Sequence, residues 1–330
     1  MNTLRKSIAL ILALTLSLTV FSVFAERDKP LIGIIQIVDH VALDAARQGF
    51  IDALAENGYK DGETVTLDYR NAQGSPDVLA SIADHFVAEN ANLVLAIATP
   101  SAQSMAGKTE SIPESIPILG TAITDYVSAR LAQSDDKPGY NVSGTTDMNP
   151  IKEQIELIKR MLPDTKTIGL LYTASEDNSV LQAQIARDVI EGMGMAYTEV
   201  TVHNSNDVQQ ATQSIMDKCD AIYIPTDNVF ASAMPVVYEV AIQNQKPVFC
   251  GEAGMTMGGG LATLGVNYYN LGHQTGLMAL KVLAGESVAD MPIERQTEFD
   301  YTVNKTFCDA LGIAIPEDLL PYAQEMSGAN

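Results

Sequence analysis

The sequence of 330 residues is poor in basic residues and contains no tryptophan. Lys and Arg number 20 against 41 Asp and Glu, which gives a net charge of −21, and no run of basic residues occurs. Nucleic acids and anionic membranes are bound through clusters of Lys and Arg, so neither is an expected partner. Aromatic residues make up only 6% of the chain. A large aromatic stacking platform is therefore not expected.

Cysteine and histidine are too few and too scattered for a disulfide framework or a metal centre. Cys219, Cys250 and Cys308 are odd in number and widely spaced, which favours separate buried thiols over a disulfide. The four histidines lack the spacing of metal ligands, so no metal is expected. No GxSxG segment, phosphate-binding loop or dinucleotide fingerprint is present. We therefore expect no catalytic residues and no cofactor.

The amino terminus has the layout of an export signal. Arg5 and Lys6 precede an uncharged, mostly apolar stretch over 7–25, and Val23 and Ala25 place small residues before a cleavage point at Glu26. We predict that residues 1–25 are a signal peptide and that the mature chain is periplasmic. An uncleaved membrane anchor is the alternative, although the apolar stretch is short for a bilayer span. No cysteine lies near the cleavage point, so lipid attachment is not expected.

The remainder of the chain alternates between predicted strands and helices. Continuous apolar runs, such as 31–38 and 93–98, are typical of strands buried on both faces of a parallel sheet. Residues 42–56 have helical periodicity and end at an Asn-Gly pair. The other predicted strands are 63–69, 116–121, 141–145, 167–172, 196–202, 221–225, 248–250 and 261–266. The other predicted helices are 76–89, 99–107, 150–161, 178–193, 207–218 and 229–244.

Two segments of the first half are echoed in the same order in the second half. Residues 32–35 (IGII) correspond to 168–171 (IGLL), and residues 94–101 (VLAIATPS) correspond to 221–228 (AIYIPTDN). Each is a buried strand followed by a helix. One such pair is weak evidence, but two pairs in register favour a duplicated α/β lobe.

Polar loops that follow the predicted strands are the candidate ligand-binding segments, because ligands of parallel α/β sheets bind beyond the carboxyl ends of the strands. Thr99-Pro100-Ser101 opens a helix and offers free N–H groups and two hydroxyls, which suit a carboxylate or phosphate. Asp227 stands in the equivalent loop of the second half and suits an ammonium group. Simple helix capping explains each residue singly. Together, an anion clamp and a facing acid suit a zwitterion, such as an amino acid.

Seven segments carry a resemblance to a known family. They are 34–44 (IIQIVDHVALD), 98–103 (ATPSAQ), 121–125 (TAITD), 141–147 (NVSGTTD), 178–182 (NSVLQ), 225–228 (PTDN) and 261–276 (LATLGVNYYNLGHQTG). With these segments the chain resembles type I periplasmic binding proteins, the solute receptors of ABC importers. Within that fold it is similar to the tryptophan/tyrosine-type substrate-binding proteins.

The resemblance implies an α/β fold of two Rossmann-like lobes with parallel sheets, joined by a three-strand hinge. Lobe 1 is expected to hold 26–146 plus 251–286, and lobe 2 to hold 147–250 plus 287–330. The first two crossings between lobes are expected at 141–147 and 250–252.

The resemblance also implies a function and a site. The chain is expected to capture an aromatic amino acid (Trp, Tyr or Phe) between the lobes and to deliver it as a monomer to membrane permease subunits. A receptor for a sugar or other small solute, or an extracytoplasmic sensor domain, is the alternative. The ligand carboxylate is assigned to Thr99, Ser101, Thr121 and Thr124. The ammonium is assigned to Asp227, Asn178 and Glu252, and the side-chain pocket to Gln36, His40, Tyr126, Tyr172 and Phe230.

Overall fold

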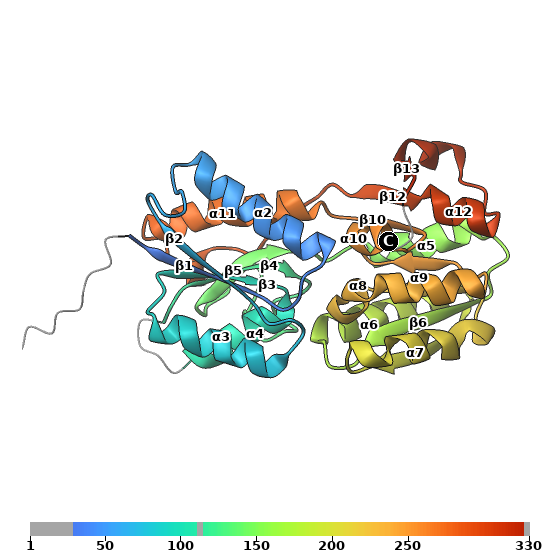
Figure 1. Cartoon of the computed structure of the whole chain (residues 1–330), viewed down its shortest axis with the longest axis horizontal. Coiled ribbons are helices and arrows are strands. Elements are labelled where there is room, and N and C mark those ends of the chain that lie inside the picture. Colours follow the sequence, from blue (N-terminus) through green and yellow to red (C-terminus); the bar gives the residue numbers. More distant parts are fainter. Residues whose placement is uncertain (1–28, 111–114, 327–330) are drawn as a thin grey trace, which may run out of the picture.

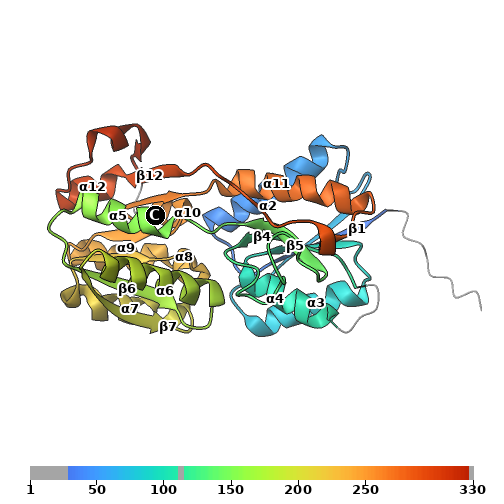
Figure 2. The same ribbon diagram turned by 180° about the vertical axis from the view of Figure 1, so that it is seen from behind.

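The computed structural model describes residues 29–110 and 115–326. The predicted signal peptide at 1–25 lies outside these ranges. Within them, no helix is long and apolar enough to cross a membrane. Two α/β lobes lie side by side along the long axis of the molecule, as Figure 1 and the reverse view in Figure 2 show.

The sheet of lobe 1 has the order β11-β5-β4-β3-β1-β2, and all of its strand pairs are parallel. Its central strands are fully buried, as their continuous apolar sequences predict. The strand bounds are β1 Leu31–Gln36, β2 Thr66–Asn71, β3 Leu93–Ile97, β4 Ile118–Ile123, β5 Val142–Thr146 and β11 Glu294–Arg295.

The sheet of lobe 2 has the order β13-β12-β10-β9-β8-β6-β7. It is parallel except at the β10–β12 pair, which is antiparallel. The strand bounds are β6 Thr167–Thr173, β7 Ala196–Val202, β8 Ala221–Ile224, β9 Val248–Cys250, β10 Ala262–Gly265, β12 Asp300–Asn304 and β13 Ala323–Gln324.

The predicted duplication is confirmed by the order of the strands. Lobe 1 runs β2-β1-β3-β4-β5 across its sheet, and lobe 2 runs β7-β6-β8-β9-β10 in the same way. The first echoed pair, 32–35 and 168–171, lies in β1 and β6. The second pair, 94–101 and 221–228, forms β3 and β8 with the starts of the helices that follow them, in equivalent places beside β1 and β6. The predicted fold class, two α/β lobes with parallel sheets, is therefore confirmed.

Helices cover both faces of each sheet. In lobe 1, α2 packs against α11, and α3 packs against α4 below the sheet in the view of Figure 1. In lobe 2, α5 packs against α6, and α7 packs against α9. The helix bounds are α2 Val41–Glu56, α3 Pro76–Ala88, α4 Thr99–Thr109, α5 Ile151–Met161, α6 Asp177–Gly192, α7 Val208–Ile215, α8 Asn228–Ser232, α9 Met234–Gln243, α10 Ala253–Met257, α11 Tyr268–Leu283 and α12 Lys305–Leu311.

The α2–α11 contact is unusually close, because glycines stand where the two helices cross. A Cβ atom added at Gly272 would lie 1.8 Å from the carbonyl oxygen of Ala46, and one at Gly49 would lie 2.0 Å from that of Tyr269. Only glycine permits this approach of one backbone to the other. The contact holds α11 against lobe 1, although the strand that precedes α11 in the chain, β10, belongs to lobe 2.

The predicted lobe boundaries after residue 250 are wrong in two places. Residues 251–286 were assigned to lobe 1, but β10 pairs with β9 and β12 in lobe 2. Residues 287–330 were assigned to lobe 2, but β11 pairs with β5 in lobe 1. The second crossing therefore follows β10 at Val266 and Asn267, and the third lies between β11 and β12. β10 is the fifth strand of lobe 2 and is equivalent to β5, the fifth strand of lobe 1. In both lobes the chain crosses to the other lobe after this fifth strand.

The predicted helix at 229–244 is two helices, α8 and α9, separated at Ala233. Pro235 stands in the first turn of α9, where its missing N–H breaks no helical hydrogen bond but where it prevents continuation from α8. The three thiols, Cys219, Cys250 and Cys308, are buried and unpaired in lobe 2.

Candidate functional site

The carboxyl ends of strands from both sheets meet between the lobes, and a narrow cavity of about 10 Å³ lies there. That volume holds roughly one water molecule, so a larger ligand gains access only when the lobes separate or the lining shifts. The lining residues are His40, Leu43, Ala122, Thr124, Asp147, Asn178, Thr226, Asp227, Asn228, Ala231, Glu252 and Tyr268.

The lining of this cavity is acidic. It contains Asp147, Asp227 and Glu252, each 1% exposed, and among the described residues that line it there is no lysine or arginine. Burial raises the pKa of all three carboxyl groups, that of Glu252 to about 7. Buried charges are normally paired, so this cavity favours a ligand that brings its own positive charge.

Asp227 is the N-cap of α8 and is held from several sides. Its Oδ1 accepts hydrogen bonds from the Thr173 hydroxyl at 2.8 Å and the Phe230 N–H at 2.9 Å, and its Oδ2 accepts one from the Thr173 N–H at 2.6 Å. Asp227 therefore caps a helix and also lines the cavity, and its assignment to the ligand ammonium stays a prediction. Burial raises its pKa.

Glu176 stands behind the lining as a further carboxylate. Its Oε2 accepts hydrogen bonds from the Asn228 side chain at 2.7 Å, the Asn228 N–H at 3.2 Å and the Asn178 side chain at 3.2 Å. Burial, followed by the neighbouring charge of Asp227, raises the pKa of Glu176 to about 7. Two lining amides are thus oriented by an acid that the sequence analysis did not single out.

Asn178 presents an acceptor without a partner. Its Nδ2 donates to Glu176, to Ser179 and to the carbonyl of Thr226, whereas its Oδ1 is buried and unbonded. A buried amide oxygen without a donor costs free energy. A ligand N–H group in the cavity would satisfy it.

Glu252 and Asp147 face the cavity from the two sheets. Glu252 caps α10, where its side chain accepts hydrogen bonds from the N–H groups of Gly254 and Met255. Asp147 directly follows β5 and accepts hydrogen bonds from the Tyr268 hydroxyl at 2.6 Å and the Thr124 hydroxyl at 3.1 Å. Both carboxylates are therefore fixed in place by donors of their own surroundings.

The start of α4 has two hydroxyl groups without partners. Thr99 and Ser101 are 2% and 0% exposed, and the Oγ atoms of both are buried and unbonded. The residue before the helix, Ala98, has φ of +77°, and Ala122 at the end of the neighbouring strand β4 has φ of +56°. Such strained backbone is common at ligand sites. Neither hydroxyl is part of the cavity lining in the closed arrangement.

Thr121 and Thr124, assigned with them to the ligand carboxylate, are placed differently from each other. The Thr124 hydroxyl lines the cavity, where it donates to Asp147 and accepts from Gln182 of α6. Thr121 lies within β4, and its hydroxyl accepts a hydrogen bond from Thr145 of the adjacent strand. Its hydroxyl is thus engaged inside lobe 1.

The five residues assigned to the side-chain pocket do not gather together. His40 lines the cavity, but the other four do not. Gln36 bonds Asp44 and Arg47 within lobe 1, and the Tyr126 hydroxyl donates to the carbonyls of Gly120 and Thr145. Tyr172 bonds Glu199 and Arg187 on the far side of lobe 2, and Phe230 is part of the core of that lobe.

Several lining residues were not predicted from the sequence: Leu43, Ala122, Asp147, Thr226, Asn228, Ala231 and Tyr268. Asp147 directly follows a predicted strand, so the rule that ligands bind beyond strand ends applies to it. Asn228 adjoins Asp227 in the same loop. Leu43 and Ala231 carry no such signal, because an apolar residue on a helix is usual anywhere.

Hydrogen bonds join the lobes across the cavity. Gln182 of α6 donates to Thr124 of lobe 1 at 3.1 Å, and His40 lies 3.4 Å from Asn228. At the exposed edge, Gln103 of α4 donates to Asp177 of α6 at 2.7 Å. The lobes are closed on each other.

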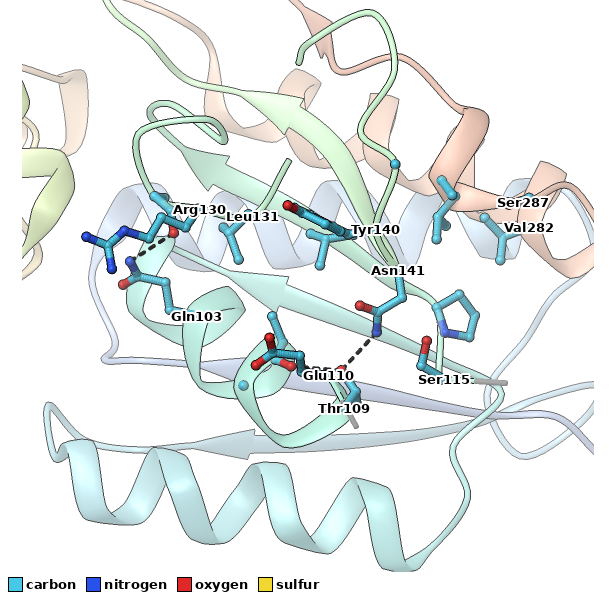
Figure 3. Close-up of a pocket in the computed structure, with 18 of the residues that line it drawn as sticks. Gln103, Thr109, Glu110, Ser115, Arg130, Leu131, Tyr140, Asn141, Val282 and Ser287 are labelled. Atoms are coloured by element: carbon cyan, nitrogen blue, oxygen red, sulfur yellow. Dashed lines mark hydrogen bonds between the residues drawn. The ribbon is translucent and has the colours of Figure 1, made fainter. Parts of the chain in front are cut away.

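A larger cavity of about 1120 Å³ lies on lobe 1, at the end of the sheet where β4 and β5 begin (Figure 3). Its polar side chains bond one another: Asn141 donates to Thr109 at 2.8 Å and to the carbonyl of Ile116 at 2.9 Å. No buried polar side-chain atom among its described lining residues lacks a partner. Of the described residues with a buried unsatisfied side-chain atom, His40 and Asn178 line the smaller cavity, Thr99 and Ser101 begin α4, and Asn304 lies at the start of α12, so none belongs to the larger cavity.

Comparisons with known proteins agree with this picture. A family model described as ABC transporter substrate binding protein matches residues 31–327. The tyrosine-binding protein of Clostridioides difficile is 39% identical over 306 residues, which cover 92% of this chain and 88% of that protein.

Two solved structures have similar sequence identity to this chain but differ in how closely their backbones superimpose on it. An ABC domain in complex with L-Trp, from Streptococcus pneumoniae, is 36% identical, covers 91% of this chain and 100% of its own, and has a TM-score of 0.85. A ligand-free, open substrate-binding protein with adhesive properties, from Clostridium difficile, is 42% identical over 90% of this chain and 100% of its own, yet its TM-score is 0.68. The lobes of this chain are thus arranged more like those of the Trp complex than like those of the open structure.

Proposed function

The chain belongs to the ABC transporter substrate-binding protein family, and from that membership we propose that it is a receptor that captures an aromatic amino acid between its two lobes. In this proposal the mature chain begins after Ala25, works outside the cytoplasm without a lipid anchor, and delivers its ligand as a monomer to membrane permease subunits.

The observation that carries the proposal is the set of unsatisfied groups around an acidic cavity. Asp147, Asp227 and Glu252 bring buried carboxylates without a basic partner in the described lining, and Asn178 offers an unbonded amide oxygen. An α-ammonium group supplies both the positive charge and the N–H donors that these groups need.

The carboxylate of the ligand is assigned to the beginning of α4. The positive end of a helix dipole favours an anion, and the unbonded hydroxyls of Thr99 and Ser101 are the donors there, since Pro100 has no N–H and the Ser101 N–H donates to the carbonyl of Ala98. Thr121 and Thr124 stay in the assignment as further hydroxyls. That of Thr121 accepts from Thr145 and keeps its own proton for the ligand. That of Thr124 donates its single proton to Asp147 in the closed arrangement and must turn to reach a carboxylate.

Relatives support an aromatic side chain on the ligand. A relative 39% identical is named a tyrosine-binding protein, and a structure 36% identical holds L-Trp. The apolar lining residues, Leu43, Ala122 and Ala231, suit a ring better than a charged side chain.

Calorimetric titration of residues 26–330 with each standard amino acid tests the proposal. We expect tyrosine, tryptophan or both to bind at least about 100-fold more tightly than leucine, glutamate or glucose, since burial of a ring contributes several kcal/mol. Mass spectrometry of any ligand retained through purification identifies the ligand independently. Tighter binding of an aliphatic or acidic amino acid, or of the sugar, would overturn the proposal.

A further inference from the structure

His40 has an unsatisfied lone pair at the cavity. The residue precedes α2, its side chain does not cap the helix, and its Nδ1 is buried without a hydrogen-bond partner. The other ring nitrogen, Nε2, lies 3.4 Å from Oδ1 of Asn228 in lobe 2.

The neighbouring bonds determine which nitrogen carries the proton. Nδ2 of Asn228 donates to Glu176 at 2.7 Å, so the amide turns its oxygen toward His40. An oxygen can only accept, hence Nε2 of His40 is the donor and Nδ1 is an acceptor. Burial lowers the pKa of His40 to about 4, so the imidazole is neutral at physiological pH.

The wall around this acceptor is apolar. Leu43 lies in the first turn of α2, directly after His40, and Ala231 lies three residues after Asn228 on α8, where the two share a helix face. All four residues line the cavity. His40 therefore offers one unpaired acceptor beside apolar side chains. The ammonium is assigned to other acceptors, the carboxylates and the Asn178 oxygen.

We propose that His40 Nδ1 accepts a hydrogen bond from a donor on the ring of the ligand. The receptor then takes aromatic amino acids that carry a ring hydroxyl or a ring N–H, and it discriminates against phenylalanine. This inference rests on the proposed function and adds to it the chemistry of the side-chain subsite. A site built to bond a ring donor rejects the analogue that lacks it, because the acceptor is left buried and unpaired.

Titration of the wild-type mature chain with four ligands that differ only at the para position of the ring gives the first test. We expect tyrosine and 4-aminophenylalanine, which donate from the ring, to bind about 10- to 100-fold more tightly than phenylalanine and 4-fluorophenylalanine, which do not. Equal, tight binding of all four would overturn the inference and leave the proposed function standing. Failure of every aromatic amino acid to bind would overturn both.

The variant His40→Gln tests whether the preference for tyrosine over phenylalanine depends on Nδ1 of His40. Glutamine keeps an N–H donor that reaches toward Asn228 but has no acceptor at the position of Nδ1. We expect its preference for tyrosine over phenylalanine to fall to less than about threefold, whatever happens to its absolute affinity. The matched control is His85→Gln, because His85 bonds Asp68 on the outer side of lobe 1 and should leave the preference unchanged. An unchanged tyrosine preference in His40→Gln would overturn the assignment, as would an equal loss of affinity for both ligands.

Discussion

At the scale of single residues, the site is defined by polar atoms that lack partners. Thr99 and Ser101 have buried, unbonded hydroxyls, and Asn178 has a buried, unbonded amide oxygen. Native proteins satisfy nearly all such groups, so a cluster of exceptions calls for an explanation. A zwitterionic ligand provides one, because its carboxylate accepts from the hydroxyls and its ammonium donates to the amide.

The hydroxyls of α4 lead to a prediction that separates binding from stability. The double variant Thr99→Val with Ser101→Ala removes groups that bond nothing in the protein, so the free energy of unfolding without ligand should change by less than about 1 kcal/mol. Affinity for the free amino acid should fall by about tenfold or more, as measured by calorimetry. Wild-type protein should also bind tyrosinamide far more weakly than tyrosine.

Thr109→Val is the control for this prediction. Its hydroxyl lies in the same helix but donates to the carbonyls of Met105 and Ala106 and accepts from Asn141. Thr109→Val should lower the free energy of unfolding and leave the affinity for the free amino acid unchanged. Full affinity in the double variant, or equal binding of tyrosine and its amide, would remove α4 from the site.

The charge of Asp227 is the second residue-scale prediction. Alanine would also delete the acceptors for Thr173 and Phe230, so asparagine, which keeps one acceptor oxygen, is the cleaner change. We expect Asp227→Asn to weaken tyrosine binding by about 100-fold, or about 3 kcal/mol, because a buried ammonium loses a carboxylate.

Asp220→Asn is a matched control for that variant. Asp220 also accepts backbone N–H groups, from Lys166 and Thr167, but it lies at the opposite end of β8. Asp220→Asn should lower the melting temperature and leave the affinity for tyrosine unchanged. If both variants bind tyrosine as the wild type does, the ammonium is not held near Asp227.

The sequence identified site residues where chemistry and strand ends coincide. Thr124 directly follows β4, Asp227 lies in the short loop after β8, and Asn178 lies in the first turn of the helix after β6; all three line the cavity. Gln36 and Tyr172 also stand at strand ends, but successive side chains of a strand point to opposite faces. Which face meets the other lobe depends on tertiary packing, and so these two residues bond within their own lobes.

At the scale of elements, the close crossing of α2 and α11 ties the chain of lobe 2 back to lobe 1. Gly272→Ala would bring a Cβ against the backbone of Ala46, which cannot move without displacing α2. We expect the melting temperature to fall by about 5 °C or more, as overpacking of a rigid contact costs about 1–3 kcal/mol.

Gly107→Ala is the matched control, because Gly107 lies in α4 and an added Cβ meets nothing within 4 Å. It should leave the melting temperature unchanged or raise it slightly, since alanine favours the helix. If the Gly272→Ala protein is as stable as the Gly107→Ala protein, α2 and α11 can move apart at little cost, and the prediction is wrong.

Most elements could be predicted because long apolar runs and helical periodicity are local signals. The strands of both lobes up to β9 fall where the sequence predicts them, within a few residues. The chain after β10 was harder to interpret, because β11 and β13 have two residues each and exist only through their pairing with β5 and β12. Pairing with a distant partner leaves no period in the sequence, which explains the wrong assignment of β11 to lobe 2. The wrong assignment of β10 has the same origin, because the strand itself is predicted but its pairing with β9 and β12 is not.

At the scale of the whole molecule, closure of the lobes is linked to occupancy of the cavity. In the closed arrangement, burial raises the pKa of Glu176 and of Glu252 to about 7, so at neutral pH their charges oppose closure unless a cation joins them. We therefore expect the ligand-free chain to open in solution and tyrosine to close it.

Small-angle X-ray scattering of the mature chain at pH 7.5 measures this change. The radius of gyration should fall when tyrosine is added, and it should not fall for Asp227→Asn at the same tyrosine concentration. Equal radii with and without tyrosine in the wild type would mean that closure does not depend on the ligand.

The central claim is that the cavity between the lobes holds the zwitterion of an aromatic amino acid. A crystal structure of residues 26–330 with L-tyrosine tests it most directly. The account predicts the ligand ammonium within hydrogen-bond distance of Asn178 Oδ1 and the ligand carboxylate at the hydroxyls of Thr99 and Ser101. Tyrosine bound elsewhere, such as in the larger cavity beside Asn141, or bound between the lobes with its two charged groups exchanged, would contradict it.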